Sequence, residues 1–123
     1  MADTDRKDER RGIERELKRG SLELIVLHLL APGEAYGYEI VTKLTEQTNG
    51  ALEVTDGTLY PVLYRLERAG SASVRWETPE RGVPRKYYRL TAVGREELRL
   101  LEEEWTNFTK AMANLLRQDR EAK

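Results

Sequence analysis

The sequence contains no cysteine, and only one histidine and one phenylalanine, among its 123 residues. Without cysteine it can form neither disulfides nor thiolate metal sites, which suits a reducing cytoplasm, where we expect it to act. The single histidine, the lack of a glycine-rich phosphate loop and the lack of a His–carboxylate cluster with ligand spacing argue against an enzyme. We therefore predict no catalytic residue, no metal and no cofactor.

Long apolar runs are also missing. The richest one, Leu22 to Ala31, has about ten residues, whereas a membrane span needs roughly 18. The N-terminal segment has no apolar region of the kind found in a secretory signal. These absences predict one domain with a modest core, an extension, and no contact with a membrane.

Acidic and basic residues are nearly balanced, with a net charge of −1. Their distribution is uneven, because residues 55–91 hold seven Lys/Arg and four Asp/Glu while residues 21–54 hold one and five. Since salt screens charges beyond about 10 Å, the local excess matters more than the total. The basic excess is modest, so useful affinity for nucleic acid would need two copies.

The first half of the chain predicts helices around a core. Residues 1–11 are almost all charged or small and are expected to be disordered, with a short leading helix from Gly12. A helix over Leu22–Leu30 is apolar on nearly every face, and we interpret its His28 as a satisfied core residue. A second helix is predicted from about Gly37 to Thr48, with Asn49-Gly50 as a left-handed stop.

A third helix, predicted to begin after Thr55 or Thr58, has one apolar face and one polar face. Its start stays open because either threonine could cap it, and the position of Pro61 favours a short or bent first turn. The core stripe comprises Leu59, Val62, Leu63 and Leu66. The other side carries hydroxyls, tyrosines and arginines, which suit phosphates and base edges. Its candidate DNA-binding residues are Gly57, Thr58, Tyr60, Pro61, Tyr64, Arg65 and, at the edge, Arg68.

A basic β-hairpin follows this helix, with strands predicted at about Ser73–Glu77 and Arg85–Leu90. Arg81, Arg85 and Lys86 are its candidate phosphate anchors, although such charges can also keep an edge hairpin soluble. Three helices and a hairpin in this order predict a winged helix-turn-helix over residues 12–91, mainly α with a small β-hairpin.

The last predicted element is a long helix over residues 92–117, before a charged tail at 118–123. Its apolar residues repeat at intervals of three and four, as in a heptad seam, and the helix is longer than its own domain can cover. A second copy is the expected partner. The predicted seam consists of Leu98, Leu101, Trp105, Phe108, Met112 and Leu115.

Three motifs resemble the PadR family of bacterial transcriptional regulators. They are LKRGSLELIVLHLLAPGEAYGYEI, GTLYPVLYRLERAG and GVPRKYYRLTAVGREEL, and the resemblance covers residues 13 to 117. Ser71, Ala72 and Ser73 depart from it, because an apolar pair usually begins the first wing strand there, so we expect the wing to be looser or to begin later. The resemblance implies a homodimeric repressor of a double-stranded operator, and dimer symmetry implies an imperfect inverted repeat.

The C-terminal run EEEWTNFTKAMANLL is similar to the multidrug-sensing branch of that family. The similarity implies that Trp105 pairs across the dimer axis and binds a small planar aromatic effector that relieves repression, while simple packing is the equal alternative. Leu101, Phe108 and Met112 would form the walls of that site and Glu104 its mouth. Two rival functions stay open: a winged-helix protein-interaction module, and a ligand-binding dimer without specific DNA binding.

Overall fold

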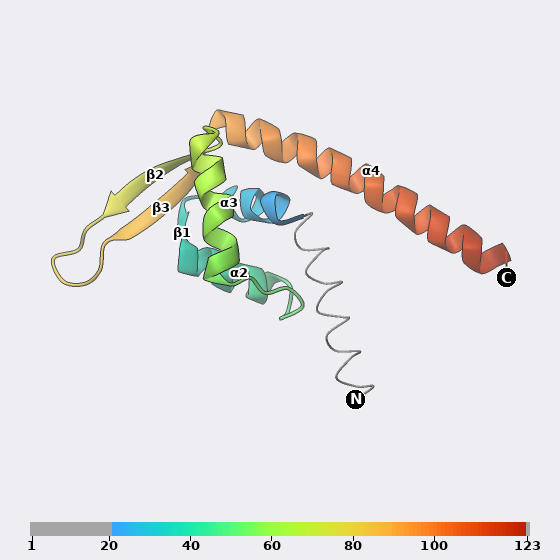
Figure 1. The fold of residues 1–123 in the computed structure, drawn as a ribbon, viewed down its shortest axis with the longest axis horizontal. Helices are drawn as coiled ribbons and strands as arrows, with labels where there is room; N and C mark the ends of the chain where they lie inside the picture. Colours follow the sequence, from blue (N-terminus) through green and yellow to red (C-terminus); the bar gives the residue numbers. More distant parts are fainter. Residues whose placement is uncertain (1–20, 123) are drawn as a thin grey trace.

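The computed structural model describes residues 21–122, and within them a helix over residues 21–30 is followed by a mixed array of helices and strands (Figure 1). The elements are β1 (Ala35–Tyr36), α2 (Gly37–Gln47), α3 (Asp56–Arg68), β2 (Ala72–Glu77), β3 (Arg85–Leu90) and α4 (Ala92–Ala122). The predicted N-terminal tail and the leading helix from Gly12 lie outside the described residues.

The core forms where three helices meet the sheet. Leu27 and Leu30 of the first helix, Ile40 of α2, and Leu59 and Leu63 of α3 are completely buried. Burying each such side chain contributes about 1.5–3 kcal/mol relative to exposure, so this cluster holds α2 and α3 in place. The stripe predicted for the third helix is therefore confirmed as its core face.

The turn between α2 and α3 is built from local hydrogen bonds. Asn49 and Gly50 both have positive φ, at 52° and 79°, which confirms the predicted left-handed stop. The Thr48 hydroxyl donates to the Leu44 carbonyl at 2.8 Å and accepts from the Leu52 N–H at 3.0 Å. These bonds fix the path of the chain from one helix of the pair to the next.

Helix α3 begins at Asp56, after Thr55 in extended conformation, which settles the open choice of cap position. Pro61 lies inside the helix, so the short form of the short or bent first turn favoured from the sequence does not occur. Pro61 has no N–H to give to the Gly57 carbonyl, and a proline ring crowds the carbonyl four residues earlier. The helix tolerates this near its exposed N-terminal end.

The sheet has the strand order β1-β3-β2, with both pairs antiparallel. The two hairpin strands fall within one residue of the predicted bounds, whereas β1 was not predicted. The expectation that the wing would be loose or begin late is wrong, because Ala72 pairs with Leu90. Ser71 and Ala72 are both buried, so small residues are required where the hairpin meets α4.

Helix α4 is anchored at its start and projects away from the rest of the molecule (Figure 1). The Thr91 hydroxyl accepts the Gly94 N–H at 3.1 Å, as an N-cap does. Leu98 is buried in the core, and the Arg95 guanidinium donates to the Ala31 carbonyl at 3.4 Å. The helix continues to Ala122 rather than ending near residue 117, so most of the segment predicted as a charged tail is helical.

Gly94 is the tightest point of this anchor. A Cβ at Gly94 would lie 2.0 Å from the Ser71 carbonyl oxygen, which also accepts the Thr91 N–H at 3.1 Å. We expect Gly94→Ala to destabilise the protein by about 1–3 kcal/mol or more, because overpacking against backbone cannot relax by rotation of a side chain. Thermal unfolding measures this destabilisation. Gly33→Ala is the control, since nothing lies within 4 Å of its added Cβ, and equal destabilisation in both variants would contradict the argument.

His28 corrects an interpretation made from the sequence. Its side chain is 62% exposed, and its Nδ1 lies 3.7 Å from Glu102 Oε1 of α4. An apolar pattern on nearly every face suggested full burial, but one side of the helix over residues 21–30 stays open to solvent beside α4. Within residues 21–122, none of the helices is both long and apolar enough to cross a membrane.

Candidate nucleic-acid interface

The outer face of α3 presents the side chains left over from its core stripe. Tyr60 and Tyr64 are 48% and 56% exposed, and Arg65 is exposed between the core positions. The Arg68 guanidinium lies 5.5 Å from the centre of the Tyr64 ring, so the two side chains contact each other on the exposed face of the helix. All seven residues that the sequence predicted as DNA-binding on this helix are exposed.

The position of Tyr60 depends on a glycine in the neighbouring helix. A Cβ on Gly37, the first residue of α2, would lie 2.6 Å from the Tyr60 hydroxyl oxygen. The phenol therefore lies against the start of α2, and a side chain at position 37 would displace it from this place. This contact couples the two helices of the helix-turn-helix and limits the freedom of an exposed aromatic side chain.

One face of the hairpin carries alternating cations and rings. The Arg75 guanidinium lies 4.6 Å from the Tyr87 ring centre, and Arg85 lies 4.8 Å from that of Tyr36. Tyr36 and Tyr87 meet edge to face at 5.4 Å. Arg75 also donates to Glu34 through Nε at 3.1 Å, and this hydrogen bond lowers the pKa of Glu34. Arg75 is thus neutralised locally.

Arg85 differs from Arg75 in its partners. Its pKa is raised chiefly by a hydrogen bond with Tyr87, and among the described residues it forms no ion pair with a carboxylate. Its side chain is exposed at the edge of the hairpin, where β1 no longer pairs with β3. Arg85 therefore offers a cation to an external anion. Arg81 is exposed in the loop that closes the hairpin.

Lys86 lies on the opposite face of β3 and ties the hairpin to α3. Its Nζ donates to Glu67 Oε1 at 2.8 Å, and this hydrogen bond raises the pKa of Lys86. The ammonium also lies 5.2 Å from the Tyr88 ring and 5.9 Å from the Trp76 ring. The predicted phosphate anchor is thus half-buried in a contact between two elements.

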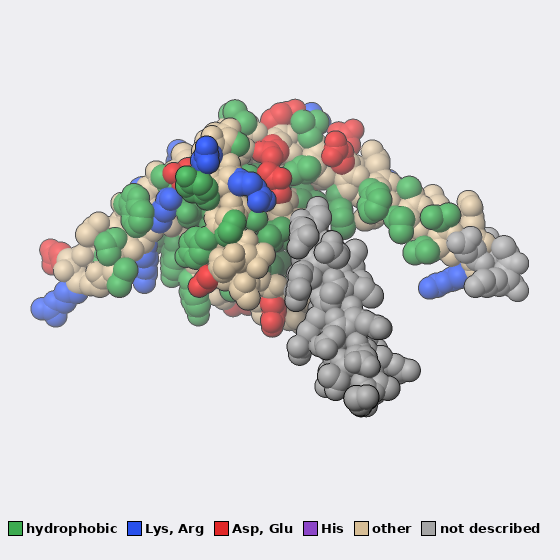
Figure 2. Space-filling view, in the orientation of Figure 1, with side chains coloured by type: hydrophobic (Ala, Val, Ile, Leu, Met, Phe, Trp, Pro, Cys, Tyr) green, Lys and Arg blue, Asp and Glu red, His purple; other side chains and the backbone are tan. Residues whose placement is uncertain are grey.

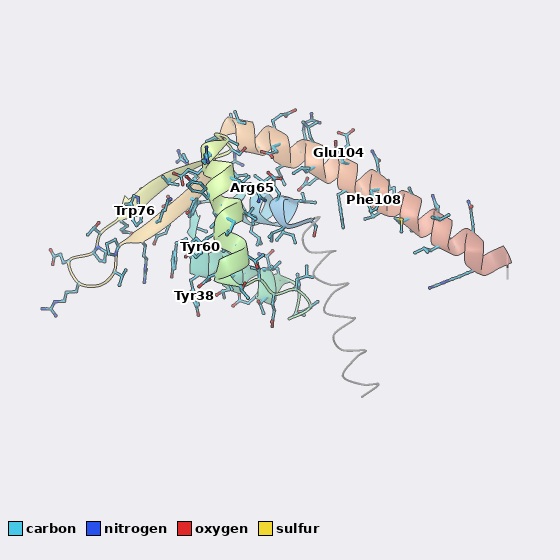
Figure 3. All side chains as sticks on the ribbon, in the orientation of Figure 1. Tyr38, Tyr60, Arg65, Trp76, Glu104 and Phe108 are labelled. Atoms are coloured by element: carbon cyan, nitrogen blue, oxygen red, sulfur yellow. The ribbon has the colours of Figure 1, made fainter. Side chains whose placement is uncertain are left out.

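The predicted DNA-binding residues come together on two adjacent elements. Figure 3 shows Tyr60 and Arg65 on α3 and Trp76 on the neighbouring hairpin. Figure 2 shows basic side chains along the hairpin and near α3, with acidic ones grouped around the start of α4. Basic side chains therefore lie on both elements that the sequence predicted as DNA-binding.

An acidic pair lies beside Arg65. The Ser71 hydroxyl, itself buried, donates to Glu97 Oε2 at 2.6 Å. Burial raises the pKa of Glu23, a hydrogen bond and repulsion from Glu97 raise it further, and Arg65 opposes the shift. Glu23 of the first helix therefore interacts with Glu97 of α4 through a hydrogen bond and charge repulsion, and with Arg65 of α3 through charge attraction.

We expect Glu23→Gln to stabilise the protein near neutral pH, with a gain that shrinks as the pH falls. A carboxyl whose pKa is raised on folding binds protons more tightly in the folded state. Its stabilising contribution is full below the unfolded pKa and is lost as the pH rises through the folded pKa. Thermal unfolding between about pH 4 and pH 8 measures the trend. Glu80→Gln, in the exposed hairpin loop, is the control, and a gain independent of pH would refute the assignment.

The predicted seam on α4 divides into a buried and an exposed part. Leu98 is buried and Leu101 packs partly against the core, whereas Trp105 is 44% and Phe108 58% exposed. Met112 and Leu115 are exposed as well. The rings of Trp105 and Phe108 lie 6.4 Å apart. Figure 2 shows hydrophobic side chains along the projecting half of α4.

Two exposed or half-buried aromatic residues of the sheet, near the candidate DNA-binding residues, were not predicted from the sequence. Tyr36 belongs to a strand of two residues, too short for its pattern to signal it. Trp76 alternates with Val74 and Ala72 on β2, and that period of two could have placed it on the face towards α3. Within residues 21–122, no group of His, Cys, Asp or Glu is arranged to hold a metal ion.

A helix-turn-helix followed by a β-hairpin wing defines a winged helix-turn-helix protein. The transcriptional regulator PadR-like family matches residues 26–100. This match spans more than half of the sequence, and the chain belongs to that family. Its members are transcriptional regulators and not enzymes, as the sequence predicted.

The relatives agree with this assignment. Transcriptional regulator Rv3488 of Mycobacterium tuberculosis is 37% identical over 93 residues, covering 72% of this chain and 83% of the relative. A PadR family regulator from Eggerthella lenta superposes with a TM-score of 0.81 at 34% identity, covering 92% and 96% of the two chains. Bacillus subtilis PadR, solved in complex with operator DNA, gives 0.59 at 28% identity, covering 69% of this chain and 46% of that one.

Proposed function

We propose that this PadR-family regulator represses transcription in the cytoplasm by binding an operator as a homodimer. Each α3 would enter a major groove, and each hairpin would follow the adjacent backbone or minor groove. The observation that carries the proposal is the exposed face of α3, where tyrosines and Arg65 stand beside a basic hairpin. The relative solved with operator DNA supports the same use of the fold.

The residues divide by position. Those on α3 would read base edges and hold phosphates: Gly57, Thr58, Tyr60, Pro61, Tyr64, Arg65 and Arg68. Arg81 and Arg85 would anchor phosphates from the wing. Lys86 has three N–H donors, so it can contact a phosphate while it keeps its bond to Glu67.

Dimerisation would use the projecting part of α4. Trp105, Phe108, Met112 and Leu115 form an exposed apolar stripe that a second copy of the same helix would cover. Two Trp105 side chains near the dimer axis would bound a slot for a planar aromatic effector, with Leu101, Phe108 and Met112 as its walls and Glu104 at its mouth. The exposure of Trp105 supports this slot.

The wing contact has a measurable signature in salt. Arg85→Ala should weaken binding to operator and to random DNA alike, and should lower the salt slope by about one, because one phosphate is no longer neutralised. Lys86→Ala should do the same and also loosen the hairpin, because it breaks the ion pair with Glu67. Fluorescence anisotropy with labelled duplexes at several salt concentrations measures both effects.

Arg99→Ala is the charge-matched control, since Arg99 pairs with Glu96 and Glu103 along α4. If the wing variants keep the parent's affinity and slope, the hairpin does not touch the backbone. Binding that is absent, or equal for operator and random sequence, in the parent itself would favour a protein-interaction module or a ligand-binding dimer.

A further inference from the structure

Glu67 is an acidic residue that its own helix does not explain. It lies in the last turn of α3, where the partial negative charge of the helix C-terminus disfavours a carboxylate. Its spacing from Tyr60 and Tyr64 places it on the same side of the helix as these two candidate DNA contacts. A carboxylate there would also repel the phosphates of a bound duplex. Neither the helix nor the proposed DNA contact therefore accounts for an acid at this position.

The hairpin supplies the partner of this carboxylate. Glu67 Oε1 accepts a hydrogen bond from Lys86 Nζ at 2.8 Å, and the two side chains are only 31% and 28% exposed. In the described part of the chain, this is the one side-chain hydrogen bond between α3 and the hairpin strands. The rings of Tyr88 and Trp76 lie 5.2 Å and 5.9 Å from the same ammonium. The lysine is therefore held between α3 and two aromatic side chains of the hairpin.

A groove of about 460 Å³ opens between the outer parts of these two elements. Tyr60 and Tyr64 of α3 line one side of it, and Trp76 and Lys86 of the hairpin line the other. The hairpin is fixed at its base, where the chain passes directly from α3 into β2. Farther out, the spacing depends on contacts between the two elements, and the Glu67–Lys86 contact is the only ion pair between them among the described residues.

We propose that Glu67 is a positioning residue for DNA recognition, which holds Lys86, and with it the hairpin, at one distance from α3. An ammonium has three N–H donors, so one can bind Glu67 while the others bind a phosphate. Phosphate contacts fix the register of a protein on a duplex, and a lysine on a flexible stem fixes it only when another group orients the ammonium. Glu67 thus favours the operator over random DNA without itself touching either. This inference rests on the proposed function, because it requires α3 and the hairpin to bind one duplex.

Glu67→Gln separates positioning from simple repulsion. Loss of a negative charge near phosphates should raise the affinity for a random duplex by about twofold to fivefold. The affinity for an operator duplex, selected by the parent protein from a random-sequence pool, should rise less or fall. The ratio of the two affinities should therefore drop by about threefold or more, as for coupled side chains. Fluorescence anisotropy measures both affinities, and an equal rise in both, with an unchanged ratio, would overturn the proposal.

Glu80→Gln is the matched control. Glu80 is exposed in the hairpin loop and forms no ion pair within the described residues. Its replacement removes the same charge from the same hairpin without changing a contact to α3, so the ratio should keep the parent's value. If thermal unfolding shows that Glu67→Gln is not folded, Glu67→Asp replaces it. That variant keeps the charge but has a shorter side chain, and it should lower the ratio with no gain in binding to random DNA.

The effect of Glu67 should depend on Lys86. In a Lys86→Ala background, Glu67→Gln should no longer change the ratio of the two affinities, because the lysine that Glu67 positions is absent. A merely structural role of Glu67 would lower the ratio in both backgrounds alike. A drop of the same size with and without Lys86 would therefore overturn the assignment.

Trp76 reports on the contact in the absence of DNA. In a full-length Trp105→Phe background, Trp76 is the only tryptophan and gives a single indole N–H resonance in a ¹H–¹⁵N correlation spectrum. This resonance should shift in Glu67→Gln and stay in place in Glu80→Gln, since the Lys86 ammonium lies 5.9 Å from the Trp76 ring. An unshifted resonance in Glu67→Gln would show that Glu67 does not hold Lys86.

Failure of this inference and failure of the proposed function give different results. A parent protein that selects no operator from the pool would overturn the proposed function and this inference with it. A parent that prefers its operator, together with a Glu67→Gln variant that prefers it equally, would overturn the positioning role alone.

Discussion

Phe108→Glu in α4 should convert the protein to a monomer and reduce its affinity for the operator by about 10²–10⁴-fold, the usual gain from linking two binding modules. Phe108 is 58% exposed in the single chain, so the change leaves the core intact. A buried glutamate in a paired seam would lack a partner, and two such charges would face each other across the axis. Sedimentation velocity measures the oligomeric state, and anisotropy measures operator binding.

Thr106→Glu is the matched control for this experiment. Thr106 is an exposed residue on the other side of α4, and the substitution adds the same charge to the same helix. It should remain dimeric with the parent's affinity. A Phe108→Glu protein that still sediments as a dimer would exclude the α4 seam as the dimer interface. The interface would then be sought in the leading helix predicted before Ser21. The dimer also predicts half-site centres about 34–36 Å apart in the operator.

Tyr64→Ala and Arg65→Ala should erode the preference for operator over random DNA, each by about 1–3 kcal/mol or roughly 5- to 150-fold. Both side chains leave α3 on its exposed face, so their removal leaves the core stripe intact. Binding to random DNA should change much less for Tyr64→Ala, because a phenol carries no charge for phosphate. Competition of labelled operator with unlabelled random duplex measures the ratio.

Arg99→Ala again serves as the control for removal of a positive charge, and thermal unfolding checks that the variants remain folded. Arg65 needs this check in particular, because its charge opposes the raised pKa of Glu23. Unchanged discrimination in folded Tyr64→Ala and Arg65→Ala proteins would show that α3 does not read the operator through this face.

The sequence by itself determined the local elements. The stripe from Leu59 to Leu66 follows a period of 3.6 residues, and Asn49-Gly50 marks a turn that only a left-handed conformation makes. The hairpin strands follow from a run between turn residues. Each of these signals lies within a few positions of the residue it describes, and for that reason a single sequence suffices to find it.

Only the tertiary structure decided which residues from distant elements meet. The same heptad pattern covers Leu98, which is buried, and Phe108, which is exposed, because α4 leaves the core after its first turns. His28 faces solvent despite its apolar neighbours, and Lys86 binds Glu67 across two elements. The groove between α3 and the hairpin likewise depends on how the two elements pack. Periodicity reports the side of an element on which a residue lies, and packing decides what that side touches.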